Sequence, residues 1–179
     1  MKLSERLVEI HRALAAARIP HAFGGAIALA YWTLDPRGTS DIDVNIFVPA
    51  TGSSRALDAL PEGIEQPPGL AEVIARDGQV RLWWDGTPVD LFFDNLPVHE
   101  DAARTRRRVP FQGVEIPVLG PVELAVFKVM FDRTRDWADL EAMAEMGSLD
   151  LDAVRATLLT MLAEDDPRFA RLEALGGEG

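Results

Sequence analysis

Residues 24–48 constrain the fold of this chain more than any other segment, and they read GGAIALAYWTLDPRGTSDIDVNIFV. The last part of this segment, from residue 41 to 48, alternates Asp41, Asp43 and Asn45 with apolar residues. Because side chains alternate between the two faces of a strand, this pattern predicts a strand with one core face and one polar face. Two carboxylates would then lie side by side where the strand begins.

The carboxylates of Asp41 and Asp43 would repel each other, and each would raise the pKa of the other unless a cation lay between them. Carboxylate oxygens are the ligands that Mg²⁺ and Mn²⁺ prefer. The pair therefore predicts a divalent-cation site, and the alternative is a solvated edge strand that carries two Asp residues. The pair precedes the apolar run, whereas it follows such a run in haloacid-dehalogenase-type phosphatases and many sugar transferases, so both of these classes are disfavoured.

Gly24 and Gly25 mark a second candidate site. They follow a short extended segment, His21–Phe23, and precede small and apolar residues, Ala26–Trp32, that predict a helix. Free backbone N–H groups at a helix N-terminus attract anions, and glycine allows a phosphate to approach closely. A plain tight turn is the alternative for the glycine pair taken alone. Together with the carboxylates, the pair predicts a phosphate site beside a metal site.

A third carboxylate comes from Asp90, in the apolar run PVDLFF. Alternation along the predicted strand puts Asp90 on the face opposite to Val89, Leu91 and Phe93. A carboxylate in so apolar a strand is costly unless it is paired or binds a metal, and a third carboxylate would complete a two-metal site. The alternative is a residue at the start of a strand that reaches solvent.

Strands and helices alternate up to about Val118, and the remaining chain reads as helical, which is typical of an α+β fold with a C-terminal helical extension. The length of 179 residues fits one domain with such an extension. The other expected elements are helices at 3–18, 53–60, 137–146 and 151–162, a loop at 61–69, a hairpin of strands 80–84 and 89–93 joined through Asp85-Gly86, a second hairpin between Val109 and Val118, and a helical segment after Pro121.

Several of these motifs, taken in order, resemble a known family. Gly-Gly, then Arg37-x-Thr39-x-Asp41-Ile42-Asp43, then a later lone strand Asp, is similar to the pattern of the DNA-polymerase-β-like nucleotidyltransferase superfamily. Downstream, Lys128 and the run Arg133–Leu140 are similar to the helical motif of its AbiEii-type branch, with Arg135 where that motif usually has Lys. This branch includes toxins of toxin–antitoxin systems and aminoglycoside-modifying relatives. The resemblance spans roughly residues 4–146.

This resemblance implies a small mixed, twisted sheet flanked by helices, with a nucleotidyltransferase catalytic domain at residues 1–118 and a C-terminal helical subdomain at 119–179. It implies that Mg²⁺, or Mn²⁺, is the cofactor, and that Asp41, Asp43 and Asp90 are the catalytic and metal-binding residues. The nucleotide-binding residues that it implies are Gly24, Gly25, Arg37, Thr39, Ser40, Lys128 and Arg133. For Arg133 and its neighbours, a structural role in helix capping and ion pairs is the alternative.

The function that the resemblance implies is transfer of a nucleoside monophosphate from NTP to a hydroxyl acceptor, with release of pyrophosphate. The acceptor stays open between a small molecule, tRNA and a protein side chain. One alternative is a catalytically inactive nucleotidyltransferase-fold binding module, or a toxin–antitoxin component with an antitoxin-type protein partner. Another is an RNA-directed enzyme that uses the basic cluster Arg104, Arg106, Arg107 and Arg108, for which a solvated helix end is the plainer explanation.

Composition narrows these classes further. There are no cysteines, which excludes disulfides, thiolate metal sites and cysteine nucleophiles. The net charge of −11 argues against non-specific nucleic-acid binding. We expect no membrane-spanning helix, because no apolar stretch approaches the ~18 residues that one needs. The charged, amphipathic first residues do not form a signal peptide, so we expect a cytoplasmic protein.

Overall fold

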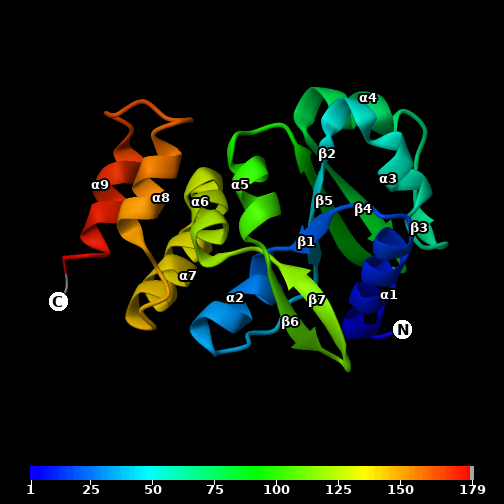
Figure 1. Cartoon of the computed structure of the whole chain (residues 1–179), viewed down its shortest axis with the longest axis horizontal. Coiled ribbons are helices and arrows are strands. Elements are labelled where there is room, and N and C mark those ends of the chain that lie inside the picture. The colour runs from blue at the N-terminus through cyan, green and yellow to red at the C-terminus, as the bar shows by residue number, and fades with distance from the viewer. Residues whose placement is uncertain (178–179) are drawn as a thin grey trace.

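The structure is a computed structural model that describes residues 1–177, and a mixed seven-stranded sheet forms its centre (Figure 1). The strands lie in the order β3-β4-β5-β2-β1-β7-β6. Their bounds are β1 His21–Phe23, β2 Ile42–Pro49, β3 Ile64–Glu65, β4 Gln79–Trp84, β5 Thr87–Asp94, β6 Arg107–Phe111 and β7 Val114–Val118. The helices are α1 Leu3–Ala16, α2 Gly25–Thr33, the 3₁₀ turn η1 Ala50–Gly52, α3 Ser54–Asp58, α4 Leu70–Asp77, α5 Val98–Thr105, α6 Pro121–Phe131, α7 Thr134–Glu145, α8 Leu151–Leu158 and α9 Pro167–Ala174.

Strand β2 is the strand that positions the acidic residues. It pairs with β1 in antiparallel fashion and with β5 in parallel, and the register places Asp43 directly beside Asp90. Its apolar side chains at 42, 44 and 46 are fully buried, as the alternation predicts. Asp43 and Asp90 therefore share the opposite face of the sheet, at neighbouring positions on neighbouring strands.

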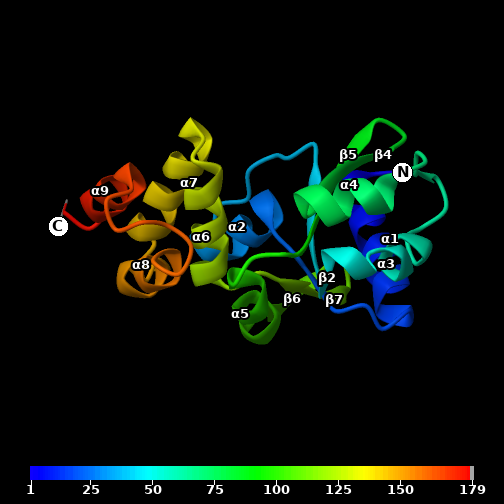
Figure 2. The ribbon, with the colours of Figure 1, turned by 90° about the horizontal axis from the view of Figure 1, so that it is seen from above.

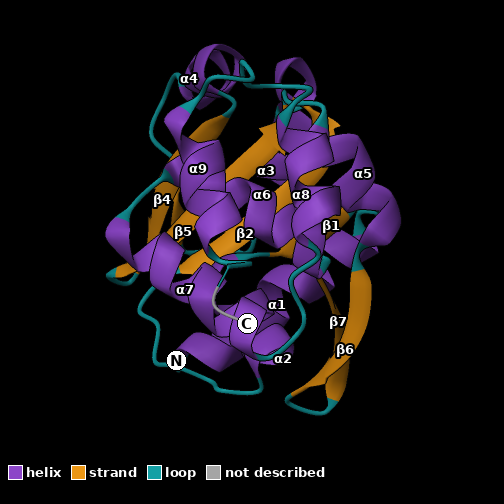
Figure 3. Ribbon diagram, turned by 90° about the vertical axis from the view of Figure 1, so that its left-hand side faces the viewer, coloured by secondary structure: helices purple, strands orange, loops and turns teal. Residues whose placement is uncertain are grey.

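Helix α6 is the central helix of the C-terminal half. It begins at Pro121, which occupies the first turn, where its missing N–H costs nothing. Seven of its eleven residues are buried, since α2, α5, α7 and α8 all contact it. Figure 2 shows α6 between the sheet and the pair α8–α9, and Figure 3 shows the same stack from its C-terminal end.

One apolar core cluster runs through both halves of the chain. It includes Phe23 and Leu91 from the sheet, Leu124 and Val129 from α6, and Leu158 from α8. The expected division of the chain at residue 118 stays a prediction. Because both halves contribute to one core, a fragment that ends at residue 118 would expose part of that core. No helix among residues 1–177 is both long enough and apolar enough to cross a membrane.

Most expected elements are present, with ends that differ by a few residues. The first helix ends at Ala16 rather than Arg18, because Arg18 has the left-handed φ of 57°. The segment 61–69 is not a loop throughout, since residues 64–65 form β3 against the end of β4. Helices α4, α5 and α9 have eight residues each and are not among the expected elements, because α4 and α5 follow Gly69 and Pro97 and α9 begins at Pro167, and each of these residues reads as a loop signal.

Candidate active site

The turn at Gly24 and Gly25 connects β1 to the N-terminus of α2 and lies against β2. Gly25 has a φ of +50°, and an added Cβ there would overlap Oδ2 of Asp43. The backbone N–H of Gly24 donates to the carbonyl of Asp43 at 3.0 Å. Glycine is therefore required at position 25 both for its conformation and for the close approach of a neighbour. In this structure the group that approaches is the carboxylate of Asp43.

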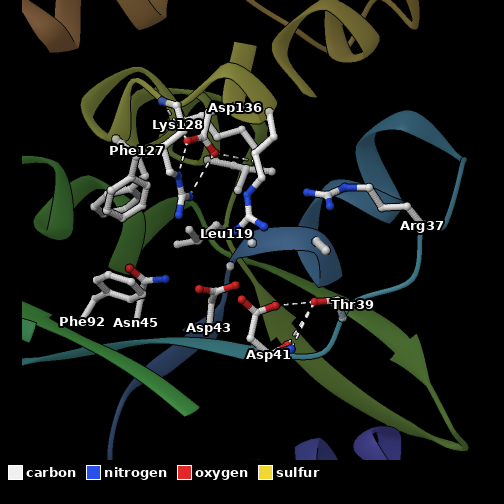
Figure 4. Close-up of a pocket in the computed structure, with 17 residues that line it drawn as sticks. Arg37, Thr39, Asp41, Asp43, Asn45, Phe92, Leu119, Phe127, Lys128 and Asp136 are labelled. Carbon is white, nitrogen blue, oxygen red and sulfur yellow. Dashed lines mark hydrogen bonds and ion pairs between the residues drawn. The ribbon is translucent and has the colours of Figure 1, made fainter. Parts of the chain in front are cut away.

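Asp41 and Asp43 lie side by side at the start of β2, as Figure 4 shows. The hydroxyl of Thr39 donates to a carboxylate oxygen of Asp41, which fixes the orientation of that side chain. Burial, followed by the negative charges of Asp41 and Asp90, raises the pKa of Asp43 to about 6, against the lowering effect of Lys128 and Arg133. The repulsion that the sequence predicts therefore acts on Asp43, after the effect of burial.

Asp90 is on the expected face of β5, and its carboxylate forms an ion pair with an arginine. Arg81, its partner across the β4–β5 pair, donates from Nε to Oδ1 at 2.7 Å and from Nη2 to Oδ2 at 2.6 Å. The structure therefore shows the paired carboxylate that such an apolar strand allows, and the metal role of Asp90 stays a prediction. An ion pair compensates the cost of placing this carboxylate in an apolar strand.

The donor chemistry of Asp41 and Asp43 fits Mg²⁺ or Mn²⁺, because both side chains offer carboxylate oxygens and they lie side by side. Asp90 does not complete the set in this conformation, since both of its oxygens face Arg81. Within residues 1–177, no three His, Cys, Asp or Glu side chains are arranged to hold a metal ion. The metal role of these residues stays a prediction.

Lys128 is buried and points into the candidate site rather than out to solvent (Figure 4). Its Nζ donates to Oδ2 of Asp139 at 2.5 Å and lies 3.8 Å from Oδ1 of Asp136. Arg37, from the loop before β2, donates to the same oxygen of Asp139 at 2.9 Å. A lysine ammonium has three N–H donors, so Lys128 keeps donor capacity for an anion in the cavity.

Arg133 has a structural role as well as a place at the cavity. It is the N-cap residue of α7, and its guanidinium binds Asp136 through two hydrogen bonds of 2.6 and 3.1 Å. Asp136 also accepts from the backbone N–H of Arg133, so the carboxylate of Asp136 caps the N-terminus of α7. The structural alternative for this pair is present in the fold, and both residues still line the cavity.

The cavity lies between the glycine turn, the start of β2 and the helices α6 and α7 (Figure 4). One side is polar, with Arg37, Thr39 and Asp41, and the inner side is apolar, with Phe92 and Phe127. A second, more open cleft of about 530 Å³ continues past β5, with Arg81 and Asp90 in its wall. Asp41 and Asp43 line both hollows, so these carboxylates lie between the more enclosed cavity and the more open cleft.

Two expected participants lie outside this arrangement. Ser40 is exposed and lines neither hollow. The basic cluster at Arg104 and Arg106–Arg108 lies at the end of α5 and on the edge strand β6, where Arg106 stacks over Phe47 and Arg108 lies 4.0 Å from Glu115. This cluster lines neither hollow, so it does not grip a phosphate chain bound there.

Arg81, Asp139 and the aromatic residues that line the cavity are not among the predicted site residues. Asp139 belongs to the helical motif, but its contacts with Lys128 and Arg37 depend on how α6 and α7 pack. The pairing of Arg81 with Asp90 has a signal in the sequence, because a hairpin turn at 85–86 sets the register that opposes these two positions. Phe92 could have been placed from strand alternation, since it shares the face of Asp90.

Comparison with known proteins establishes the fold. No protein-family model matches the sequence, and no curated protein matches it. Among solved structures, the antibiotic-resistance factor ANT(2'')-Ia aligns over 98% of this chain and 97% of its own, with a TM-score of 0.62 and 14% identity. An antigenic nucleotidyltransferase-like protein from Paracoccidioides brasiliensis aligns over 94% of this chain and 92% of its own, with a TM-score of 0.50 and 17% identity. The chain therefore has the nucleotidyltransferase fold, as its motifs predict.

Proposed function

We propose that this protein is a nucleotidyltransferase that transfers a nucleoside monophosphate from NTP to a hydroxyl acceptor and releases pyrophosphate. One observation carries the proposal: the carboxylate of Asp43 lies directly against Gly25 at the N-terminus of α2, beside Asp41 and in a cavity that Lys128 enters. Phosphoryl transfer depends mainly on positioning and on charge stabilisation, and this arrangement supplies both next to one another.

The residues that would bind the triphosphate are cationic or offer backbone N–H groups. The glycine turn opens α2, whose N-terminus favours anions. Lys128 keeps free donors in the cavity, and Arg37 and Arg133 reach the same space. Thr39 acts through Asp41, which it holds in place. We assign no contact to Ser40.

Asp41 and Asp43 would hold the divalent cation, Mg²⁺ or Mn²⁺. When bound, the cation neutralises phosphate charge and lowers the pKa of the acceptor hydroxyl. Asp90 would complete the set or accept the proton of the acceptor hydroxyl, because it faces the open cleft beside Asp43.

The open cleft is the proposed acceptor site. Its cavity volume of about 530 Å³ lies within the range of small-molecule sites. Its wall carries the polar residues Arg81, Asp90 and Gln79 beside apolar ones such as Val73 and Phe92, so we propose an acceptor that carries hydroxyl groups. A small molecule, as for the aminoglycoside-modifying relatives of the AbiEii-type branch, suits this cleft better than a long RNA, because the basic cluster at residues 104–108 lies outside it.

The test is label transfer. The protein is incubated with α-labelled NTPs, Mg²⁺ and panels of aminoglycosides, tRNA and proteins. We expect label on one acceptor class, with loss of transfer by a factor of at least about 10³ in Asp41→Asn and in Asp43→Asn, the scale on which removing a charge-stabilising group acts. Asp152→Asn is the matched control, because Asp152 is an exposed residue of α8 outside both hollows. Transfer that persists in both site variants would contradict the proposed mechanism.

A non-catalytic binding module is the second candidate, and the Arg81–Asp90 pair favours it, because this pair keeps the third carboxylate from the other two. Such a module would serve in a toxin–antitoxin pair with a protein partner. Ligands that bind only the folded state raise its melting temperature. A rise with NTP and Mg²⁺ supports the enzyme, and no rise with any NTP and either Mg²⁺ or Mn²⁺ supports the module.

A further inference from the structure

The pair between Arg81 and Asp90 is the feature of the acidic face that the proposed function does not use. It is bidentate, with two short hydrogen bonds, and it joins directly opposed residues of β4 and β5. The two partners differ in exposure: the side chain of Arg81 is 53% exposed and that of Asp90 is 14% exposed. The guanidinium of Arg81 therefore lies on the solvent side of the pair, while the carboxylate of Asp90 is mostly buried against the sheet.

The surroundings explain why Asp90 takes a cation here. Its register neighbour on β2 is Asp43, and Asp41 lies beside Asp43, so three carboxylates gather on this face of the sheet. Lys128 and Arg133 reach Asp43 from the opposite side and are themselves paired with carboxylates of α7. Arg81 is the cation that neutralises the third charge.

A guanidinium and a divalent cation cannot hold Asp90 in the same way at the same time. The fork of Arg81 occupies one lone pair on each carboxylate oxygen, and its positive charge repels a second cation a few ångströms away. In this arrangement residues 1–177 contain no group of three His, Cys, Asp or Glu side chains that could hold a metal ion. Release of Arg81 is the one change on this face that would free both oxygens of Asp90.

Arg81 is able to leave. Its side chain lines the open cleft and is half-exposed, and its neighbours Val80 and Leu82 keep the strand in the sheet through the opposite face. A divalent cation carries twice the charge of the half-exposed guanidinium, so a bound divalent cation can displace Arg81 from the carboxylate. We propose that Arg81 is an exchangeable counter-ion that competes with a divalent cation for Asp90. This inference rests on the proposed function, in which Asp90 joins Asp41 and Asp43 around the cation.

The test measures the affinity for Mn²⁺ alone, by electron paramagnetic resonance of free Mn²⁺, in the full chain. We expect Arg81→Ala to bind Mn²⁺ roughly fivefold more tightly, the factor that about 1 kcal/mol gives. Arg81→Lys keeps the positive charge but loses the bidentate contact, so its affinity for Mn²⁺ should lie between those of the wild type and Arg81→Ala. Arg168→Ala is the matched control, because Arg168 makes the same bidentate contact with Asp166 at the start of α9, and neither residue lines either hollow. Its removal should leave the affinity within about twofold, since screening weakens distant charges.

Asp90→Asn separates competition for Asp90 from a general effect of charge. In the Asp90→Asn background, Arg81→Ala should no longer tighten binding, because the contested carboxylate is gone. Tightening that persists there, or a weaker affinity in Arg81→Ala alone, would overturn the competition and assign Arg81 a supporting role. A wild-type affinity that depends on Asp43 but is unchanged in Arg81→Ala overturns this inference alone. Mn²⁺ binding no tighter than in Asp43→Asn, in every variant, removes the metal site of the proposed function as well.

Discussion

Asp43 is the residue of the candidate site whose ionisation most clearly opposes folding. Its pKa is raised to about 6 by burial and by the charges of Asp41 and Asp90, from an ordinary value of 3.8. An acid with a raised pKa in the folded state favours folding only while it is protonated. Its stabilising contribution is complete below pH 4 and is lost as the pH rises through about 6. At neutral pH the folded protein without metal carries an uncompensated charge.

Asp43→Asn should therefore be more stable than the wild type at pH 7 in the presence of EDTA. The expected gain is near zero at pH 4 and reaches about 1–3 kcal/mol at pH 7, since each unit of pKa shift corresponds to about 1.4 kcal/mol. Urea unfolding from pH 4 to pH 8 measures the difference. A difference that does not change with pH, or a variant less stable than the wild type at pH 7, would be inconsistent with the raised pKa.

Helices α6 and α7 are joined by charges as well as by packing. Lys128 of α6 and Asp139 of α7 are both buried, and Arg37 reaches the same carboxylate from the loop before β2. A buried ion pair adds little net stability, because both charges lose water, but removal of one partner leaves the other uncompensated. This contact fixes the position of the lysine within the cavity.

Asp139→Asn should cost about 3–5 kcal/mol of stability, because it leaves Lys128 buried with only Asp136 at 3.8 Å. Addition of Lys128→Met should recover most of that loss, since it removes the unpaired charge and keeps an apolar side chain of similar length. Urea unfolding of the two single variants and the double variant forms the cycle. Arg37→Ala is the comparison that should cost less than about 1 kcal/mol, as its side chain is partly exposed. Strictly additive losses in the double variant would argue against the coupling.

At the level of elements, the sequence predicts what depends on local pattern. Alternation placed Asp43 and Asn45 on one face of β2, and the resemblance to a family predicted the fold. The contacts that neutralise the charges were not predicted, because they depend on tertiary packing: Asp139 meets Lys128 only when α6 and α7 cross, and Asp90 meets Arg81 only in the register of β4 and β5. The residue types indicate which side chains are candidate ligands. Whether each of these side chains is free or paired with another charge can be seen only in the folded structure.

The whole molecule is organised around α6, which contributes Leu124, Val126 and Val129 to the same core as the sheet. We expect a chain of residues 1–118 alone to lack a cooperative thermal unfolding transition, because the surfaces that α6 covers would be exposed to water. Circular dichroism melts of this fragment and of the full chain provide the measurement. A cooperative transition in the fragment would support an independent catalytic domain at residues 1–118.

The two borders of the sheet have a consequence for how the protein behaves when concentrated. One border is β3, which has only two residues, and the other is β6, which carries Arg107, Arg108 and Pro110. Short strands, like charges and proline each hinder the addition of a foreign strand. Molecules crowded together should therefore resist joining sheet to sheet, and the backbone hydrogen bonds of this fold should remain within one polypeptide.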